Sequence, residues 1–186
     1  MVGVSQLAAP ASTRPSKSRA RAPVIVGSNA GGARGCSQLE LHSATVTDPQ
    51  PQYWFELVVR YADTDAQGHV YFANYLTYFD EAFTGYLHAI GYPPKQMLEE
   101  GVDVVYRDAQ CEYLGSCRFE DRLKIGVQVA RFGTTSFTLR YVIDNAGAVV
   151  ARGRLTNVCV DRQAMTKVNV PRGLVEAVEA FERGRA

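Results

Sequence analysis

Alternating hydrophobic and polar residues predict β-strands in several parts of this 186-residue chain. Residues 55–61 place Phe55, Leu57 and Val59 on one face with a period of two, which is typical of a half-buried strand. The same period recurs in four later segments. We expect strands over residues 102–114, 122–132, 136–144 and 148–161, with a turn at 145–147.

A helical period separates the first strand from the others. Hydrophobic residues recur at i, i+3, i+4 and i+7 between residues 75 and 90, which predicts one amphipathic helix of about 16 residues with a wide aromatic stripe. Asn74 is a candidate N-cap and Gly91 a candidate C′ residue of this helix. A short helix over residues 94–100 and a C-terminal helix that begins at Pro171 are also expected.

This order of elements predicts the fold class. Consecutive strands joined by short turns form an antiparallel sheet, and a single helix with a broad hydrophobic stripe must bury that stripe against the sheet. We therefore expect an α+β domain over residues 51–186, in which a curved antiparallel sheet of about five strands wraps around one long central helix.

Residues 1–50 differ in composition from the rest of the chain. The first acidic residue is Glu40, and residues 1–39 contain five basic residues, six serines and seven alanines. Such a segment has little hydrophobic surface to offset its ordering entropy and is predicted to be disordered. A basic, acid-poor, Ser/Ala-rich N-terminus is typical of an organellar transit peptide, which predicts a chloroplast or plastid protein. The alternative is a bacterial tail or a misassigned start codon, with a cytoplasmic protein.

Composition also excludes several functions. The formal net charge of +1 gives no electrostatic argument for a nucleic-acid partner. No apolar run approaches the roughly 18 residues of a membrane span, so an integral membrane protein is excluded. The four cysteines lack metal-ligand spacing and are too scattered for a disulfide scaffold. We expect no metal and no cofactor.

The loop before the long helix carries the candidate chemistry. Asp65 lies in this loop, and one interpretation is that it only stabilises a turn. In the functional interpretation, a carboxylate beside a helix N-terminus acts as general base or nucleophile on an acyl carbon. Free backbone N–H groups and the helix dipole would then stabilise the oxyanion.

The segment DTDAQGHVYFANYLTYFDEA, residues 63–82, resembles the opening motif of the 4-hydroxybenzoyl-CoA thioesterase-like family of hotdog-fold proteins. That motif is roughly D-x-D-x-x-G-x-V-x-x-x-x-Y, followed by the central helix. The resemblance continues less strictly to about Asp161 and leaves the N-terminal tail outside. It implies a hotdog fold, hydrolysis of acyl thioesters, and a homodimer or homotetramer with sites between subunits.

The resemblance also implies roles for individual residues. Asp65 matches the catalytic aspartate, and Tyr61 matches a tyrosine that some members keep near it. The backbone N–H groups of Val70, Tyr71 and Phe72 are implied to polarise the thioester carbonyl. The Phe72 side chain, however, replaces a histidine or tyrosine of other members and cannot transfer a proton. His69 is either an assisting group or a surface histidine.

Substrate contacts are expected in two places. The acyl chain would lie along the aromatic stripe near Tyr75, Tyr78 and Phe79, although most of that stripe must be core. Some family members bind the CoA nucleotide through a basic cluster at a turn between two later strands. The equivalent turn here offers Arg131, Thr134, Thr135 and Ser136, whose hydroxyl groups can donate to phosphate. Its weak positive charge leaves both acyl-CoA and acyl carrier protein open as the carrier. Arg118, Arg152 and Arg154 are further candidate phosphate contacts.

Two other functions fit the same residues. A hotdog dehydratase or hydratase would pair Asp65 with His69, and a non-catalytic module would bind acyl thioesters without turnover. Only a hydrolase releases a free thiol. In a plastid, fatty-acid release from acyl carrier protein and hydrolysis of a naphthoyl-CoA intermediate would both be plausible roles.

The predicted tail can be tested directly. Deleting residues 1 to about 45 is expected to leave folding and activity intact, because the tail lies outside the predicted domain. A fluorescent fusion of the same segment should enter an organelle in plant or algal cells. Cytosolic retention of the fusion, or unfolding of the truncated protein, would contradict the transit-peptide interpretation.

Overall fold

The computed structural model describes residues 50–184, so the predicted N-terminal tail lies almost wholly outside the described residues. The expected strands and helices are confirmed, except that the first strand ends at Val58 and a short 3-10 helix follows it. The elements are β1 (Tyr53–Val58), η1 (Tyr61–Asp63), α1 (Asn74–Ala89), α2 (Pro94–Glu99), β2 (Val102–Tyr113), β3 (Arg122–Phe132), β4 (Ser136–Asn145), β5 (Ala148–Asp161) and α3 (Arg172–Arg183).

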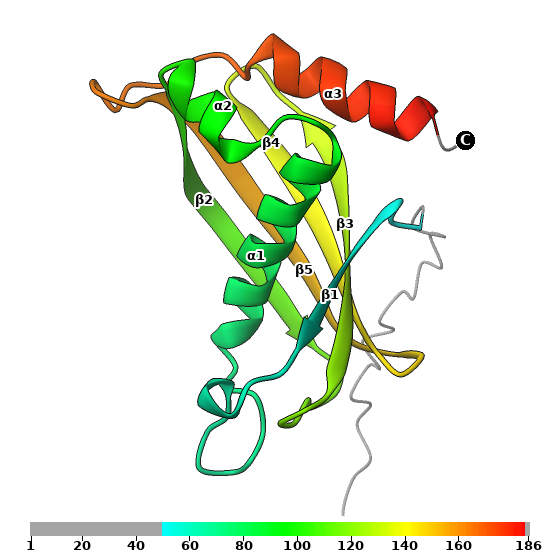
Figure 1. Cartoon of the computed structure of the whole chain (residues 1–186). Helices are drawn as coiled ribbons and strands as arrows, with labels where there is room; N and C mark the ends of the chain where they lie inside the picture. The colour runs from blue at the N-terminus through cyan, green and yellow to red at the C-terminus, as the bar shows by residue number, and fades with distance from the viewer. Residues whose placement is uncertain (1–49, 185–186) are drawn as a thin grey trace, which may run out of the picture. The chain divides into compact units, whose positions relative to one another are not determined.

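The five strands form one antiparallel, curved sheet in the order β1-β3-β4-β5-β2 (Figure 1). The expected hairpin pairing holds for β3, β4 and β5. It is wrong for β2, which pairs with β5 at the far edge rather than with β3. Residues 114–121 instead cross one end of the sheet, and β1 pairs with β3. The twelve-residue strand β2 is therefore an edge strand.

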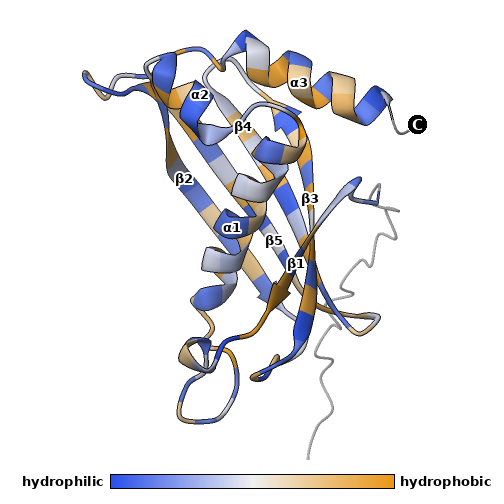
Figure 2. Cartoon of the chain, in the orientation of Figure 1, coloured by the Kyte–Doolittle hydropathy of each residue, from blue (hydrophilic) through white to orange (hydrophobic). Residues whose placement is uncertain are grey.

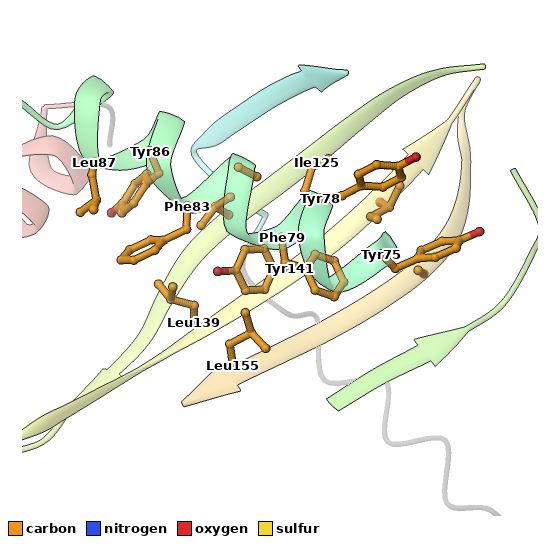
Figure 3. Close-up of a cluster of buried hydrophobic side chains, with 14 of the residues drawn as sticks. Tyr75, Tyr78, Phe79, Phe83, Tyr86, Leu87, Ile125, Leu139, Tyr141 and Leu155 are labelled. Carbon is orange, nitrogen blue, oxygen red and sulfur yellow. The ribbon is translucent and has the colours of Figure 1, made fainter. Parts of the chain in front are cut away.

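Helix α1 lies across one face of this sheet, and its aromatic stripe forms the core between the two layers (Figures 1 and 3). The stripe contributes Tyr75, Tyr78, Phe79, Ala82, Phe83, Tyr86 and Leu87, all buried. Opposite them lie alternate residues of β3 and β4, including Ile125, Leu139 and Ile143, none of which is exposed. Hydrophobic and hydrophilic residues accordingly follow one another along these strands (Figure 2).

The ring of Phe79, on α1, lies directly against Gly153 of β5. A Cβ atom built on Gly153 would overlap the ring of Phe79, and the same ring stacks on Tyr141 of β4 with centroids 4.5 Å apart. Figure 3 shows Phe79 and Tyr141 side by side between the helix and the strands. The absence of a side chain at Gly153 therefore makes room for the Phe79 ring between α1 and the sheet.

The two ends of α1 differ from each other in how they are capped. At the C-terminal end, Gly91 has φ +76°, its N–H donates to His88, and that of Tyr92 donates to Leu87. This is a Schellman motif and confirms the predicted C′ glycine. At the N-terminal end the predicted N-cap is wrong by one residue, because Ala73 is the N-cap and Asn74 is the first helical residue.

Helix α3 packs against the C-terminal end of α1. Phe181 meets the ring of Tyr86 edge to face, with centroids 5.9 Å apart, and Leu174 and Val178 join the core. Among the described residues, no helix is long and apolar enough to cross a membrane.

Gly153→Ala should destabilise the protein because its methyl group would push the Phe79 ring out of its place. Overpacking of a close-packed core typically costs about 1–3 kcal/mol of unfolding free energy. Chemical denaturation would measure that loss. The same substitution should cost less in a Phe79→Leu background, where the ring edge is absent. Equal costs in the two backgrounds would show that the ring contact is not the cause.

Candidate active site

The loop that joins β1 to α1, residues 59–73, lies at one end of the sheet, at the lower end of Figure 1. An isolated antiparallel bridge between Thr64 and Val70 closes its tip. The loop is also tied to the segment that crosses this end of the sheet. The Val70 N–H donates to the Cys117 carbonyl over 2.8 Å, and the Val59 N–H donates to the Asp121 carbonyl over 2.9 Å.

Asp65 lies within this closed tip and is half-buried. Its Oδ1 accepts a hydrogen bond from the Gln67 N–H at 2.8 Å, and its backbone pairs with His69 and Gly68. Gly68 has φ +77°, a conformation that favours glycine and lets the tip close. The second carboxylate oxygen, Oδ2, accepts no hydrogen bond from the described residues. The structure thus combines both sequence interpretations, since Asp65 stabilises a turn and keeps one oxygen available.

A second aspartate, Asp63, holds the base of the loop. Its carboxylate accepts hydrogen bonds from the backbone N–H and the guanidinium of Arg60, at 2.9–3.2 Å. Its carbonyl accepts from the Tyr71 N–H and from the Asn74 side-chain amide. Asn74 therefore fastens the start of α1 to the loop rather than capping the helix.

Burial and the hydrogen bonds from Arg60 shift the pKa of Asp63 in opposite directions. Burial alone would raise the pKa of the Asp63 carboxyl, but the hydrogen bonds from the Arg60 guanidinium and N–H outweigh it, so the pKa is lowered. Burial also raises the pKa of the neighbouring Tyr78 hydroxyl, and the Asp63 charge raises it further. At neutral pH the loop is therefore held by an ionised Asp63 with a neutral Tyr78 behind it.

The start of α1 offers fewer oxyanion donors than the resemblance implied. The N–H of Val70 donates to Cys117 and that of Tyr71 to Asp63, so neither is free to bind an oxyanion. For these two residues the expectation is wrong in this conformation. In the part of the chain that the structure describes, the N–H groups of Phe72 and Ala73 donate to no protein acceptor. Phe72 thus keeps its expected role as a prediction, and Ala73 joins it.

Two other residues expected near Asp65 point their side chains elsewhere. Tyr61 is 77% exposed and packs edge to face on Phe119, with ring centroids 5.8 Å apart. The Nε2 atom of His69 lies 3.4 Å from the guanidinium of Arg118. His69 meets Asp65 through the backbone, where the Asp65 N–H donates to the His69 carbonyl.

The residues expected to line the acyl chain are core residues in this structure. Tyr78 and Phe79 have no exposed surface and Tyr75 is 3% exposed, because all three face the sheet (Figure 3). Exposed hydrophobic side chains next to the start of α1 include Phe72 and Leu76 of the loop and helix and Tyr113 of β2. The Tyr113 hydroxyl donates to the Phe72 carbonyl at 2.9 Å and so fixes the helix start against β2.

The residues expected to bind the carrier lie at the other end of the sheet. Strand β3 begins beside the Asp65 loop and ends at the turn that holds Thr134 and Thr135, with Arg131 and Ser136 on either side. Eleven strand residues separate the two ends by roughly 30 Å. The backbone carbonyls of Thr134 and Thr135 accept hydrogen bonds from the N–H groups of Val170 and Cys159. Within one chain, this turn and Asp65 therefore do not form one site.

Comparison with known proteins identifies the family. The sequence model described as the thioesterase-like superfamily matches residues 59–178, which is more than half of the chain. The chain belongs to the thioesterase-like superfamily. Its match begins just before the Asp65 loop and ends in α3, so it includes the whole of the site described above.

Individual relatives of this thioesterase-like protein agree with that assignment. It is 32% identical to 1,4-dihydroxy-2-naphthoyl-CoA hydrolase of Thermosynechococcus vestitus, over 67% of this chain and 86% of that protein. It is 30% identical to the acyl-CoA thioester hydrolase YbgC of Escherichia coli, over 63% of this chain and 88% of that protein.

Solved structures confirm the hotdog fold. A protein from Aquifex aeolicus superposes with a TM-score of 0.65 at 27% identity, covering 68% of this chain and 98% of its own. A 1,4-dihydroxy-2-naphthoyl-CoA thioesterase from Synechocystis superposes with the same TM-score at 22% identity, covering 70% and 97% of the two chains. The latter likeness concerns the fold alone.

The framework that supports Asp65 was not predicted from the sequence. Arg60, Asp63 and Asn74 hold the loop, yet only Asp65 was singled out within the D-x-D pair. The spacing of Arg60 and Asp63, three residues apart, is the sequence signal that was available. Asp63 thus has a structural role, beside the candidate catalytic role of Asp65 two residues later.

Replacing Asp63 tests this structural role. Asp63→Asn should lower the unfolding free energy at pH 7 by about 1–3 kcal/mol, because charge-assisted hydrogen bonds are lost. A lowered pKa in the folded state stabilises above the unfolded value of 3.8, and the gain disappears as pH falls through the folded pKa. Urea unfolding of both proteins at several pH values should therefore show the difference shrinking below about pH 4. A difference that grows in acid would contradict this role.

Proposed function

We propose that this protein hydrolyses acyl thioesters to a free acid and a thiol, with Asp65 as the reactive carboxylate. The observation that carries the proposal is the loop before α1, where a half-buried Asp65 with one open oxygen accompanies unpaired N–H groups at a helix start. Membership of the thioesterase-like superfamily supports it independently. No observation favours dehydration, because the His69 side chain contacts Arg118 rather than Asp65.

The chemistry follows from these groups. Asp65 either takes a proton from water as the water attacks the thioester carbon, or attacks that carbon itself to form an anhydride that water then cleaves. In both routes the carbonyl oxygen gains negative charge, which the Phe72 and Ala73 N–H groups would stabilise near the positive end of the helix dipole. The C–S bond then breaks as the oxyanion collapses. In the first route the sulfur takes the proton that Asp65 removed from water, and in the second it leaves as a thiolate and takes a proton from solvent, so a thiol is released in both.

The substrate is proposed to be an acyl-CoA. Both relatives named above are hydrolases of CoA thioesters by name, which favours CoA over acyl carrier protein. Because Tyr78 and Phe79 are completely buried, the acyl group is proposed to lie along the exposed side chains of Phe72, Leu76 and Tyr113. Tyr75 would form the wall behind it.

The separation of Asp65 from the β3–β4 turn supports a dimer. Strand β2 is a long edge strand, and such edges readily pair with another chain. Antiparallel pairing of two β2 strands around a two-fold axis would turn the opposite end of the partner sheet toward the Asp65 loop. The turn at residues 131–136 of the partner would then be available to hold the carrier.

A plastid location is proposed from the composition of residues 1–39 alone. The fusion experiment described for the tail tests it, independently of the enzymatic proposal.

Asp65→Asn is expected to reduce turnover by roughly 10²–10⁴-fold, the usual contribution of a general base. The amide keeps the size of the carboxylate and its hydrogen bond to Gln67, so folding should survive. Substrate binding should change little, because the charge acts mainly as the transition state forms. Thiol release from an acyl-CoA, together with melting temperature, would be measured for the variant and the wild-type protein.

Two further variants make that result specific. His69→Ala should cost much less turnover than Asp65→Asn, and a larger loss would favour dehydratase-like chemistry. Asp144→Asn is the matched control, since Asp144 also accepts a backbone N–H, from Gly147 in the β4–β5 turn. Near-normal turnover of a folded Asp65→Asn protein would exclude the mechanism.

The same variant tests the proposed dimer. Asp65→Asn protein, refolded together with a variant in which Thr134, Thr135 and Ser136 are alanine, should show more activity than either variant alone. In a mixed dimer one site combines an intact Asp65 with an intact partner turn, so up to about a quarter of all sites would be restored. No gain from mixing, or a mass of one chain by sedimentation, would exclude a shared site.

A further inference from the structure

Arg118 lies beside the Asp65 loop, in the segment that crosses this end of the sheet. The carbonyl of its neighbour Cys117 accepts the Val70 N–H at 2.8 Å. The N–H of Arg118 donates to Oδ2 of Asp121, also at 2.8 Å. Both bonds fix the backbone of Arg118, while its guanidinium is exposed and lies 3.4 Å from His69. The cation therefore has a defined place next to the candidate catalytic loop.

The contact with His69 constrains both side chains. A guanidinium can only donate hydrogen bonds, so Nε2 of His69 is the acceptor side of this contact. An imidazole carries no negative charge, so the contact does not neutralise the guanidinium. His69 is thus a positioning residue for Arg118.

Two aspartates at this end of the sheet already have other partners. Asp63 is bound by Arg60, and Asp121 accepts from the Asn145 side chain and from the Arg118 backbone. Among the described residues, no carboxylate oxygen lies within 4.0 Å of the Arg118 guanidinium. The two other arginines considered from the sequence differ, because Arg152 pairs with Glu112 and Arg154 with Asp108. Arg118 alone of the three therefore keeps its charge without a carboxylate partner.

Exposed aromatic rings accompany this charge. Phe119 follows Arg118 directly and packs against Tyr61 edge to face. Both rings are largely exposed, at 48% and 77%. Next to the candidate nucleophile the surface thus combines one available cation with hydrophobic rings, which suits an anionic group on a partly apolar ligand.

We propose that Arg118, positioned by His69, binds a phosphate of the carrier arm of the thioester. This inference rests on the proposed function, since it concerns the same substrate. A guanidinium matches the geometry of phosphate oxygens and can donate two parallel hydrogen bonds to them. Both CoA and the phosphopantetheine arm of a carrier protein have such a phosphate, so the ligand chemistry is shared and the source must be distinguished by experiment.

Arg118→Gln tests the proposal with one acyl group on three carriers, namely CoA, 4′-phosphopantetheine and pantetheine. Removing an exposed charge that binds phosphate should raise KM roughly 2- to 5-fold for the first two carriers. Acyl-pantetheine has no phosphate, so its KM should not change. An effect on acyl-CoA alone would assign the CoA diphosphate or 3′-phosphate, and an effect on both phosphorylated carriers would assign the phosphate next to pantetheine.

Salt dependence gives a second measurement. In the wild-type protein, KM for acyl-CoA should rise with ionic strength because salt screens the exposed contact, and this rise should be weaker in Arg118→Gln. His69→Ala should raise the same KM to a smaller extent. Arg122→Gln is the matched control, since Arg122 is an exposed arginine nearby at the start of β3, and it should leave KM unchanged.

Two outcomes would overturn the proposal. Equal KM increases for all three carriers would show that Arg118 does not recognise phosphate, and an unchanged KM for acyl-CoA would show that it does not bind the carrier. These outcomes can be told apart from failure of the proposed function. If the protein is not a thioesterase, the wild-type protein will release no thiol from any of the three substrates.

Discussion

The close contact between α1 and the sheet is the constraint on which the rest of the structure depends. Phe79 can stack on Tyr141 only because Gly153 presents no side chain beneath it. That contact holds α1 against the strands at Phe79 and, through the helix, helps to place its first residues. The N–H groups of Phe72 and Ala73 lie about two turns away from it.

The two aspartates of the loop have different roles, Asp63 a structural one and Asp65 the proposed chemical one. Asp63 is buried and its charge is used by Arg60, so it resembles a conventional structural ion pair with backbone hydrogen bonds added. Asp65 is half-buried and uses only one oxygen within the protein. A reactive carboxylate is positioned more precisely when other groups hold its backbone. The neighbouring Asp63, with Arg60 and Asn74, provides that support at the base of the loop.

Local sequence patterns predicted nearly all elements of the fold, and the resemblance predicted the position of Asp65. Period-two and helical spacing depend on burial of one face, which each segment shows by itself. The placement of β2 at the far edge could not be predicted in this way, because pairing with β3 or β5 would bury the same face. Likewise, the loss of the Val70 N–H to Cys117 depends on two segments that are 47 positions apart meeting in space.

The Asp65 loop and the β3–β4 turn lie at opposite ends of the sheet, so the proposed reactive groups and carrier contacts lie on separate segments. The groups proposed for bond breaking all belong to one short stretch that α1 and Asp63 hold rigidly. The groups proposed for the carrier belong to other segments, namely Arg118 on the crossing segment and, in a dimer, a turn of the partner chain. Replacing the exposed Arg118 side chain would keep the backbone hydrogen bonds that join Cys117 and Asp121 to the loop, and the turn lies at the other end of the sheet. Recognition of the carrier can therefore change while the reactive carboxylate and its oxyanion donors remain in place.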